Sequence, residues 1–119
     1  MIKRRVLVVD DEPSMLELLT ELLTALGQQA RGVPPADARA ALAAGPWDVL
    51  LVDLALPPND GTELIAWAKA RWPGLRCVLY SAQPDTAAIA RLAQTVGADA
   101  WLPKPFDLAA LAVAVGGEG

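Results

Sequence analysis

Three aspartates are the residues of this chain best suited to chemistry. Asp10 and Asp11 directly follow an apolar run at residues 6–9, and Asp53 directly follows another at residues 49–52. If the two runs are parallel strands of one sheet, the carboxylates meet at its carboxyl edge, where such folds bind ligands. At roughly 5 Å and an effective dielectric of about 20, each pair would repel by about 3 kcal/mol. A hard divalent cation such as Mg²⁺, which prefers oxygen ligands, would offset this repulsion.

Two further polar residues follow predicted strands. Ser81 comes after the apolar run at residues 77–80, and Lys104 comes shortly after the weaker run at residues 100–102. Phosphoryl transfer asks a protein mainly to position the group and to neutralise its oxygens, and a carboxylate can itself be the nucleophile. We therefore predict that Asp53 accepts a phosphoryl group, with the Lys104 ammonium and the Ser81 hydroxyl contacting its oxygens.

Composition limits the alternatives. The 119 residues are enough for one domain, which we expect to span residues 1–119, and 54% of them are hydrophobic. The net charge of −4 argues against nucleic-acid binding. The chain has no histidine, so a metal site would use oxygen ligands, and its one cysteine, Cys77, excludes an internal disulfide and fits a reducing compartment. We expect a cytoplasmic protein, because no apolar run approaches the about 18 residues of a membrane span and the N-terminus does not match a signal peptide.

Short apolar runs alternate with segments of helical period. Strands are predicted at residues 6–9, 29–33, 49–52, 77–80 and 100–102, the second and last with weaker signals. The helix between the first two strands has Pro13 near its start and Gly27 at its end, with an apolar stripe that includes Leu18. The remaining helices are predicted at about residues 35–43, from Asp60 to about residue 72, at about residues 89–96 and at 107–115. Five such βα units in a row indicate an α/β fold with a parallel sheet and helices on both faces.

The last predicted helix is apolar on all sides. Ala109, Ala110, Val113 and Ala114 fall outside the stripe predicted to face the core. A surface helix without a polar face usually contacts something, although alanine used only as a helix former would give the same pattern. We therefore predict an apolar interaction surface on this helix.

Four segments resemble the receiver domains of two-component response regulators. They are residues 8–13, residues 52–57 with Asp60-Gly61, residues 81–82, and residues 97–99 through 104–106. Each segment alone is weakly specific, but four in order, each after a predicted strand, are strongly specific, and the resemblance covers nearly the whole chain. It implies a flavodoxin-like doubly wound (βα)5 sandwich with strand order 2-1-3-4-5. It also implies a signalling domain that phosphorylates and dephosphorylates itself, rather than a turnover enzyme.

The resemblance also implies residue roles. Asp53 would be the phosphoacceptor, and Mg²⁺, or Mn²⁺ in its place, would be bound by Asp11, Asp53 and the Ala55 backbone carbonyl, with Asp10 acting mainly through water. Ser81 and Trp101 match the family's switch pair of a hydroxyl and an aromatic residue. The bond from Lys104 to Pro105 would be cis, which would aim the ammonium at the phosphate.

The same resemblance implies partners. The phosphodonor would be a histidine kinase, a histidine phosphotransfer protein or a small phosphodonor. A dimer mate, a kinase or an output domain would dock on the face made by the fourth helix, the fifth strand and the fifth helix, beside Trp101.

Two departures from the family pattern affect the expected behaviour. Trp101 is bulkier than the usual Tyr or Phe, so a full inward rotation on phosphorylation is less secure. Ala55 has no side chain near the site of hydrolysis, and Gln83 at the second tuning position is neutral. We therefore expect a phosphoryl group that is not unusually short-lived.

Other interpretations stay open. Taken singly, the three aspartates would be strand-end caps or solvated charges, and Asp48, Asp85, Asp99 and Asp107 are best interpreted that way. A pseudo-receiver, which binds partners without phosphorylation, is the main alternative function, but the complete set of site residues argues against it. A phosphatase with an aspartate nucleophile would need an acid where Ala55 stands, and a flavin protein would need a phosphate loop where residues 10–12 are acidic.

Overall fold

The computed structural model describes residues 3–56, 59–82, 85–104 and 107–116. Its main element is a five-stranded sheet with the order β2-β1-β3-β6-β7, in which all neighbours are parallel. The strands are β1 (Arg5–Val9), β2 (Gln29–Val33), β3 (Val49–Asp53), β6 (Arg76–Ser81) and β7 (Ala100–Pro103). A short antiparallel pair, β4 (Ala55–Leu56) and β5 (Asn59–Asp60), lies outside this sheet. Since β6 and β7 are the fourth and fifth strands of the parallel sheet, the predicted order 2-1-3-4-5 is confirmed.

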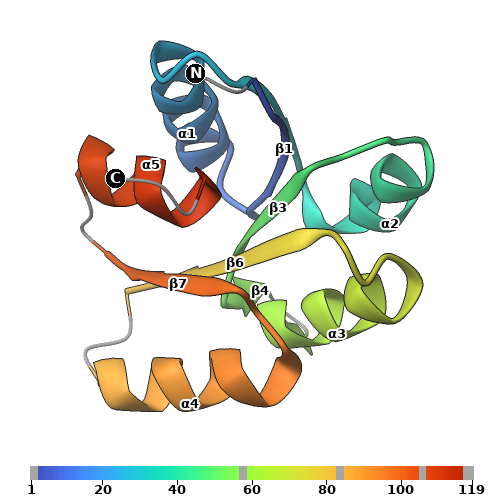
Figure 1. Cartoon of the computed structure of the whole chain (residues 1–119), viewed down its shortest axis with the longest axis vertical. Coiled ribbons are helices and arrows are strands. Elements are labelled where there is room, and N and C mark those ends of the chain that lie inside the picture. Colours follow the sequence, from blue (N-terminus) through green and yellow to red (C-terminus); the bar gives the residue numbers. More distant parts are fainter. Residues whose placement is uncertain (1–2, 57–58, 83–84, 105–106, 117–119) are drawn as a thin grey trace.

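Within the described residues, helices cover both faces of the sheet (Figure 1). They are α1 (Pro13–Ala25), α2 (Pro35–Ala43), α3 (Gly61–Arg71), α4 (Thr86–Val96) and α5 (Leu108–Gly116). Buried residues of α1 and α5 share one apolar cluster, and those of α2, α3 and α4 share the other. The predicted doubly wound α/β architecture is therefore confirmed. Of the helices in these ranges, none has the length and apolar character needed to cross a membrane.

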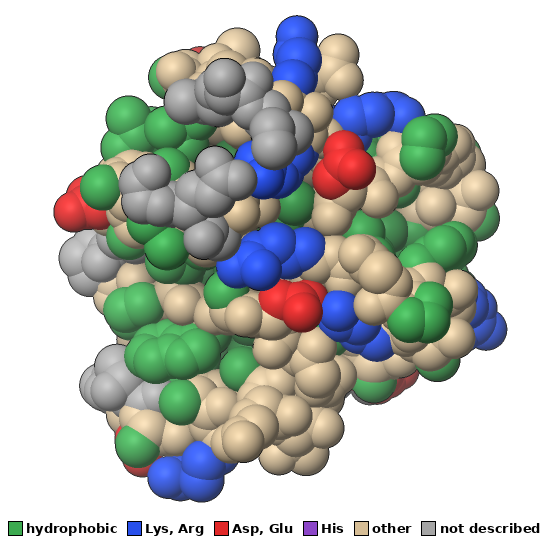
Figure 2. Space-filling view, in the orientation of Figure 1, with side chains coloured by type: hydrophobic (Ala, Val, Ile, Leu, Met, Phe, Trp, Pro, Cys, Tyr) green, Lys and Arg blue, Asp and Glu red, His purple; other side chains and the backbone are tan. Residues whose placement is uncertain are grey.

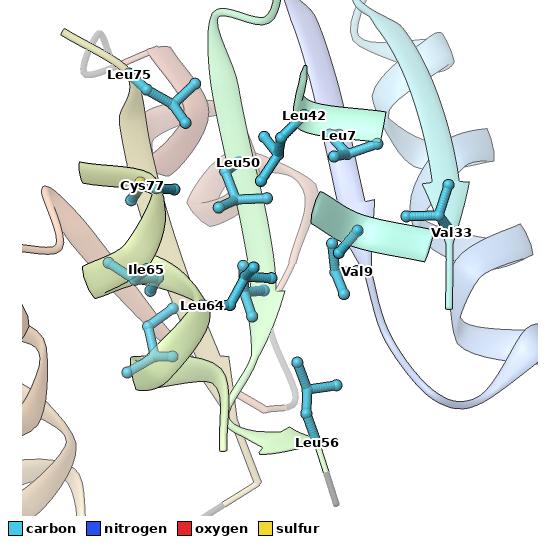
Figure 3. Close-up of a cluster of buried hydrophobic side chains, with 14 of the residues drawn as sticks. Leu7, Val9, Val33, Leu42, Leu50, Leu56, Leu64, Ile65, Leu75 and Cys77 are labelled. Carbon is cyan, nitrogen blue, oxygen red and sulfur yellow. The ribbon is translucent and has the colours of Figure 1, made fainter. Parts of the chain in front are cut away.

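The strands divide their side chains between the two clusters by simple alternation. In β1, Leu7 and Val9 lie in the cluster that faces α2 and α3, whereas Val6 and Val8 lie in the opposite one. Figure 3 shows side chains of the cluster that includes α2, α3 and α4, and these side chains come from both the strands and the helices. Because β1, β3 and β6 are buried on both faces, they appear in the sequence as continuous apolar runs.

Element ends follow local capping. Asp60 begins α3 by accepting a hydrogen bond from the Thr62 N–H at 3.0 Å, and Asp85 and Asp107 do the same for α4 and α5. Gly97 ends α4 in the left-handed region, at φ 80°. The predicted start of α3 at Asp60 and the predicted end of α4 at residue 96 are confirmed.

Two predictions of helix faces are wrong. In α5, Ala114, predicted to lie outside the core stripe, is buried at 5% exposure together with Leu111 and Val115, whereas Leu108, predicted to lie in that stripe, is exposed. The buried stripe is thus rotated from the predicted one, because α5 is apolar on every side and periodicity alone does not define which side meets β7 and β6. In α1, Leu18 is 47% exposed although it was placed in the apolar stripe, and Leu19 and Leu23 form the fully buried line.

Candidate functional site

The three aspartates predicted from the sequence meet at the carboxyl edge of the sheet. Asp10, Asp11 and Asp53 each offer a carboxylate oxygen within 4.8 Å of the others. Asp10 and Asp53 are buried, at 1% and 5% exposure, whereas Asp11 is exposed. The register that pairs Val9 with Val52 aligns the ends of β1 and β3, and this alignment brings the carboxylates together.

Asp53 is held by groups on both sides. Its Oδ1 accepts a hydrogen bond from the Ala55 N–H at 3.2 Å, and its Oδ2 lies 3.4 Å from Lys104 Nζ. Burial raises the pKa of the Asp53 carboxyl, and the Asp10 charge raises it further, while the Ala55 N–H and Lys104 act in the opposite direction. The result is a carboxylate that is costly to charge and therefore more basic than usual, beside a lysine that stabilises its charged form.

Asp10 is also held through both of its oxygens. Oδ1 accepts the Glu12 N–H at 2.9 Å, and Oδ2 accepts the Tyr80 hydroxyl at 2.6 Å. Such contacts offset the cost of burying a carboxylate. Asp10 is therefore fixed in place next to Asp53.

Lys104 follows β7, the outermost strand of the sheet, and its side chain extends from there to Asp53. Its N–H donates to the Ser81 carbonyl at 2.7 Å, which continues the β6–β7 pairing past the end of the strand. Its Nζ lies 4.9 Å from the centre of the Tyr80 ring, a favourable cation–π contact. The Lys104–Pro105 peptide predicted to be cis lies outside the described residues.

The other predicted site residues lie around this edge. Ser81 ends β6 and is buried, and Ala55 begins β4 and is exposed. Trp101 lies in β7, half-buried against the cluster shared with α3 and α4. Gln83, predicted to affect hydrolysis, lies outside the described residues.

Gly61 lies against the backbone of Asp53 and Leu54, at the end of β3. Its N–H donates to the Leu54 carbonyl at 2.8 Å. A Cβ at this position would overlap the Asp53 carbonyl oxygen and lie 2.8 Å from Val52 Cγ1. Glycine is needed here because α3 begins in direct contact with the end of β3.

The donor set fits a hard divalent cation. The gathered side chains supply carboxylate oxygens, which Mg²⁺ prefers, and an ion among them would relieve their mutual repulsion. The cluster is thus a site that could bind a metal ion.

Comparison with known families identifies the class of protein. Residues 6–116 match the model of the response regulator receiver domain. The chain therefore belongs to the receiver domains of two-component response regulators, and its acidic cluster is consistent with the phosphoacceptor site of that family.

Curated relatives are longer proteins. The chain is 36% identical over 104 residues to the DNA-binding transcriptional regulator NtrC of Azospirillum brasilense, covering 87% of this chain and 21% of that protein. It is 36% identical over 116 residues to the response regulator protein PilR of Pseudomonas aeruginosa, covering 93% and 25%. The chain thus spans about a fifth to a quarter of the length of these relatives.

Solved structures share the fold. A sensor protein from Polaromonas sp. JS666 is 28% identical with a TM-score of 0.84, and the match covers 96% of this chain and 94% of that one. A response regulator protein from Burkholderia pseudomallei, solved with a phosphorylated aspartic acid, a calcium ion and citrate, is 26% identical with a TM-score of 0.84, covering 95% and 66%.

Sequence reasoning missed the part that Tyr80 takes in this site. Tyr80 was included only as the last apolar residue of a predicted strand, yet its hydroxyl contacts Asp10. The signal that could have found it is a hydroxyl near the carboxyl end of an otherwise apolar run, beside Ser81, where side chains reach the ligand edge.

Proposed function

We propose that this chain accepts a phosphoryl group on Asp53 and thereby switches a partner or an adjoining output domain. One observation carries the proposal: Asp53 lies in contact with Lys104 while sharing an acidic cluster with Asp10 and Asp11. The buried carboxylate of Asp53 is the nucleophile, and the lysine is placed to neutralise an incoming phosphoryl oxygen.

The transfer conserves atoms and charge. A bond forms between a carboxylate oxygen of Asp53 and phosphorus as the P–N bond of a phosphohistidine breaks. The electron pair of that bond stays on the imidazole nitrogen, which takes up a proton from solvent. With acetyl phosphate the P–O bond breaks and acetate leaves. The Ser81 hydroxyl, at the buried end of β6, would donate to a phosphoryl oxygen.

Asp11, Asp53 and the Ala55 carbonyl would bind Mg²⁺, or Mn²⁺ in its place, with Asp10 acting through water. The ion supplies positive charge that offsets the charge of the carboxylates and of the phosphoryl oxygens. Asp10, held by its two hydrogen bonds, would keep its place when the ion binds or leaves.

Several findings support the proposed setting. The Burkholderia pseudomallei relative is described with a phosphorylated aspartic acid and a bound cation. NtrC and PilR carry most of their length outside the matched region, which is where an output domain would lie. We propose a single receiver domain in the cytoplasm, with a histidine kinase or a histidine phosphotransfer protein as its phosphodonor.

The phosphoryl group should not be unusually short-lived. Ala55 is exposed and carries no polar side chain that could orient a water molecule for attack. Decay of the phosphorylated protein over minutes or longer is the expected result, and a substantially faster decay would contradict this part of the proposal.

The docking face would be formed by α4, β7 and α5. Figure 2 shows apolar side chains on the side of the molecule where β7 and α4 lie. A shallow groove of about 470 Å³ on this side is lined by Arg76, Ala100, Trp101, Leu102, Ala109, Ala110, Val113 and Ala114. Although Ala114 is buried, Val113 is 47% exposed in the wall of the groove. We propose that a second copy of the chain or the output domain docks there.

The matched variants Val113→Asp and Leu18→Asp test this face, because both wild-type side chains are 47% exposed and only Val113 lines the groove. Sedimentation of the phosphorylated protein should show weaker self-association for Val113→Asp and no change for Leu18→Asp. Equal effects of the two substitutions would contradict the docking face without bearing on the phosphoacceptor.

Incubation with acetyl phosphate tests the proposed phosphoryl transfer. Intact mass spectrometry should show the mass of one added phosphoryl group on the wild type in the presence of Mg²⁺, and none in the presence of a chelator. Asp53→Asn should remain unlabelled, whereas Asp37→Asn, which changes an exposed aspartate of α2, should label normally. Labelling of Asp53→Asn at the wild-type rate would overturn the proposal, and an unlabelled but partner-binding wild type would indicate a pseudo-receiver.

A further inference from the structure

Tyr80 connects the two charged sides of the site. Its hydroxyl donates to Asp10 Oδ2 at 2.6 Å on the β1 side, and its ring lies 4.9 Å from Lys104 Nζ on the β7 side. The register of the sheet pairs Tyr80 in β6 directly with Asp53 in β3. Strand β3 lies between β6 and β1, the strand that leads to Asp10. The side chain is fully buried.

We propose that Tyr80 is a positioning residue of the phosphoacceptor site: its hydroxyl holds Asp10 for metal binding and its ring supports Lys104 beside Asp53. The inference rests on the proposed function. It adds a residue that contacts neither the phosphoryl group nor the metal and acts through Asp10, which would reach the metal through water, and through Lys104, which would contact the phosphoryl group.

The hydroxyl can act only as a donor toward Asp10 Oδ2. A carboxylate offers no donor, so the proton in this hydrogen bond is that of the Tyr80 phenol. Asp10 Oδ1 is occupied by the Glu12 N–H at 2.9 Å. With one donor on each oxygen the carboxylate plane has a defined orientation, and each oxygen keeps a lone pair for a metal-bound water.

The ring acts on a different partner. A cation near an aromatic face is stabilised by the ring quadrupole, more strongly where water is excluded. Lys104 has only 20% of its side chain exposed. The contact with the ring therefore favours the lysine orientation that keeps Nζ 3.4 Å from Asp53 Oδ2.

A purely structural role would give different results. Tyr80 packs in the apolar cluster with Val8, Leu51 and Val78, and any large side chain there contributes to stability. If packing were its only task, Tyr80→Phe would keep the packed ring and leave Mg²⁺ affinity unchanged. The two roles are separable because Phe keeps the ring and removes only the hydroxyl.

The test compares Tyr80→Phe, Tyr80→Leu and Asp10→Asn, singly and as Tyr80→Phe/Asp10→Asn, by calorimetric titration with Mg²⁺. Tyr80→Phe should weaken Mg²⁺ binding by about 10-fold, as expected when a hydrogen bond that orients a ligand is removed. In the Asp10→Asn background the same substitution should have no further effect, because Tyr80 acts on the metal through Asp10. Tyr80→Leu should in addition slow acetyl phosphate labelling at saturating Mg²⁺, since Lys104 loses its support.

The outcomes separate this inference from the proposed function. Wild-type protein that binds Mg²⁺ and labels on Asp53, together with an unchanged Mg²⁺ affinity in a folded Tyr80→Phe, overturns the role of Tyr80 alone. An equal loss of affinity with and without Asp10 also overturns it, because the effect would then not pass through that carboxylate. Wild-type protein that neither binds Mg²⁺ nor labels overturns the proposed function and the role of Tyr80 with it.

Discussion

Lys104 Nζ lies 3.4 Å from Asp53 Oδ2, although the two residues are 51 positions apart in the sequence and β6 separates their strands. Both side chains are largely buried, so the pair is poorly screened by water. The pair connects the end of β7, the outermost strand, to the acidic cluster at the ends of β1 and β3.

Replacement of this lysine should slow phosphorylation. We expect Lys104→Met to lower the rate of acetyl phosphate labelling by about 100-fold, because a preorganised positive group at the developing phosphoryl charge is lost. The rate is measured by intact mass spectrometry over time. Lys69→Met, which removes a lysine paired with Asp99 away from the site, is the control and should label at the wild-type rate. Equal rates for Lys104→Met and wild type would show that the ion pair has no part in the transfer.

Asp53 should destabilise the metal-free protein at neutral pH. Because burial raises its pKa in the folded state, the unfolded chain loses this proton more readily, and stability falls as pH rises through the folded pKa. Asp53→Asn removes that cost, so its free energy of unfolding in a chelator should exceed that of the wild type by about 1 kcal/mol at neutral pH. Urea denaturation across the acidic range should show the difference shrinking as pH falls. A less stable Asp53→Asn would mean that the Lys104 ion pair outweighs burial.

Gly61 should tolerate no side chain. An added Cβ would overlap the Asp53 carbonyl oxygen, so Gly61→Ala must displace either α3 or the end of β3. We expect a loss of roughly 1–3 kcal/mol in the free energy of unfolding. Gly74→Ala is the matched control, because a Cβ there meets nothing within 4 Å. Similar denaturation midpoints for the two variants would disprove the close approach.

Asp99 should contribute to stability above acidic pH. Partial burial works against its charge, but the hydrogen bonds from Lys69 and the Cys77 N–H, with the charges of Lys69 and Arg76, outweigh burial and lower the pKa of Asp99. Because the pKa is lower in the folded state, the charged Asp99 stabilises the protein at pH values above its unfolded pKa of about 4. This stabilisation is lost as pH falls through the folded pKa. Melting temperatures of wild type and Asp99→Asn should therefore differ at neutral pH and converge in acid. A constant difference across the acidic range would argue against this linkage.

The parts of the fold that the sequence predicts well depend on short-range patterns. Strands β1, β3 and β6 are buried on both faces and appear as unbroken apolar runs, and Asp60 and Gly97 mark helix ends by their own backbone chemistry. The gathering of Asp10, Asp53 and Lys104 follows from the same patterns, because carboxyl ends of parallel strands share one edge.

The remaining features depend on three-dimensional packing. Ala114 is buried, but α5 is apolar on every side, so the spacing of its apolar residues alone does not show which side faces the core. Tyr80 counts as apolar in a strand pattern, and its contact with Asp10 depends on a side chain reaching across β3. The contact of Gly61 with the Asp53 backbone is likewise a property of how α3 is placed.

The most direct test of the account is a crystal structure of the protein with Mg²⁺ and beryllium fluoride, which imitates a phosphoryl group on a carboxylate. We predict beryllium bonded to a carboxylate oxygen of Asp53, Lys104 Nζ in contact with a fluorine, and the metal bound by Asp11, Asp53 and the Ala55 carbonyl, with Asp10 reaching it through water. Beryllium fluoride bound elsewhere, or absent while Asp53 keeps its contact with Lys104, would contradict the claim that this carboxylate is the phosphoacceptor.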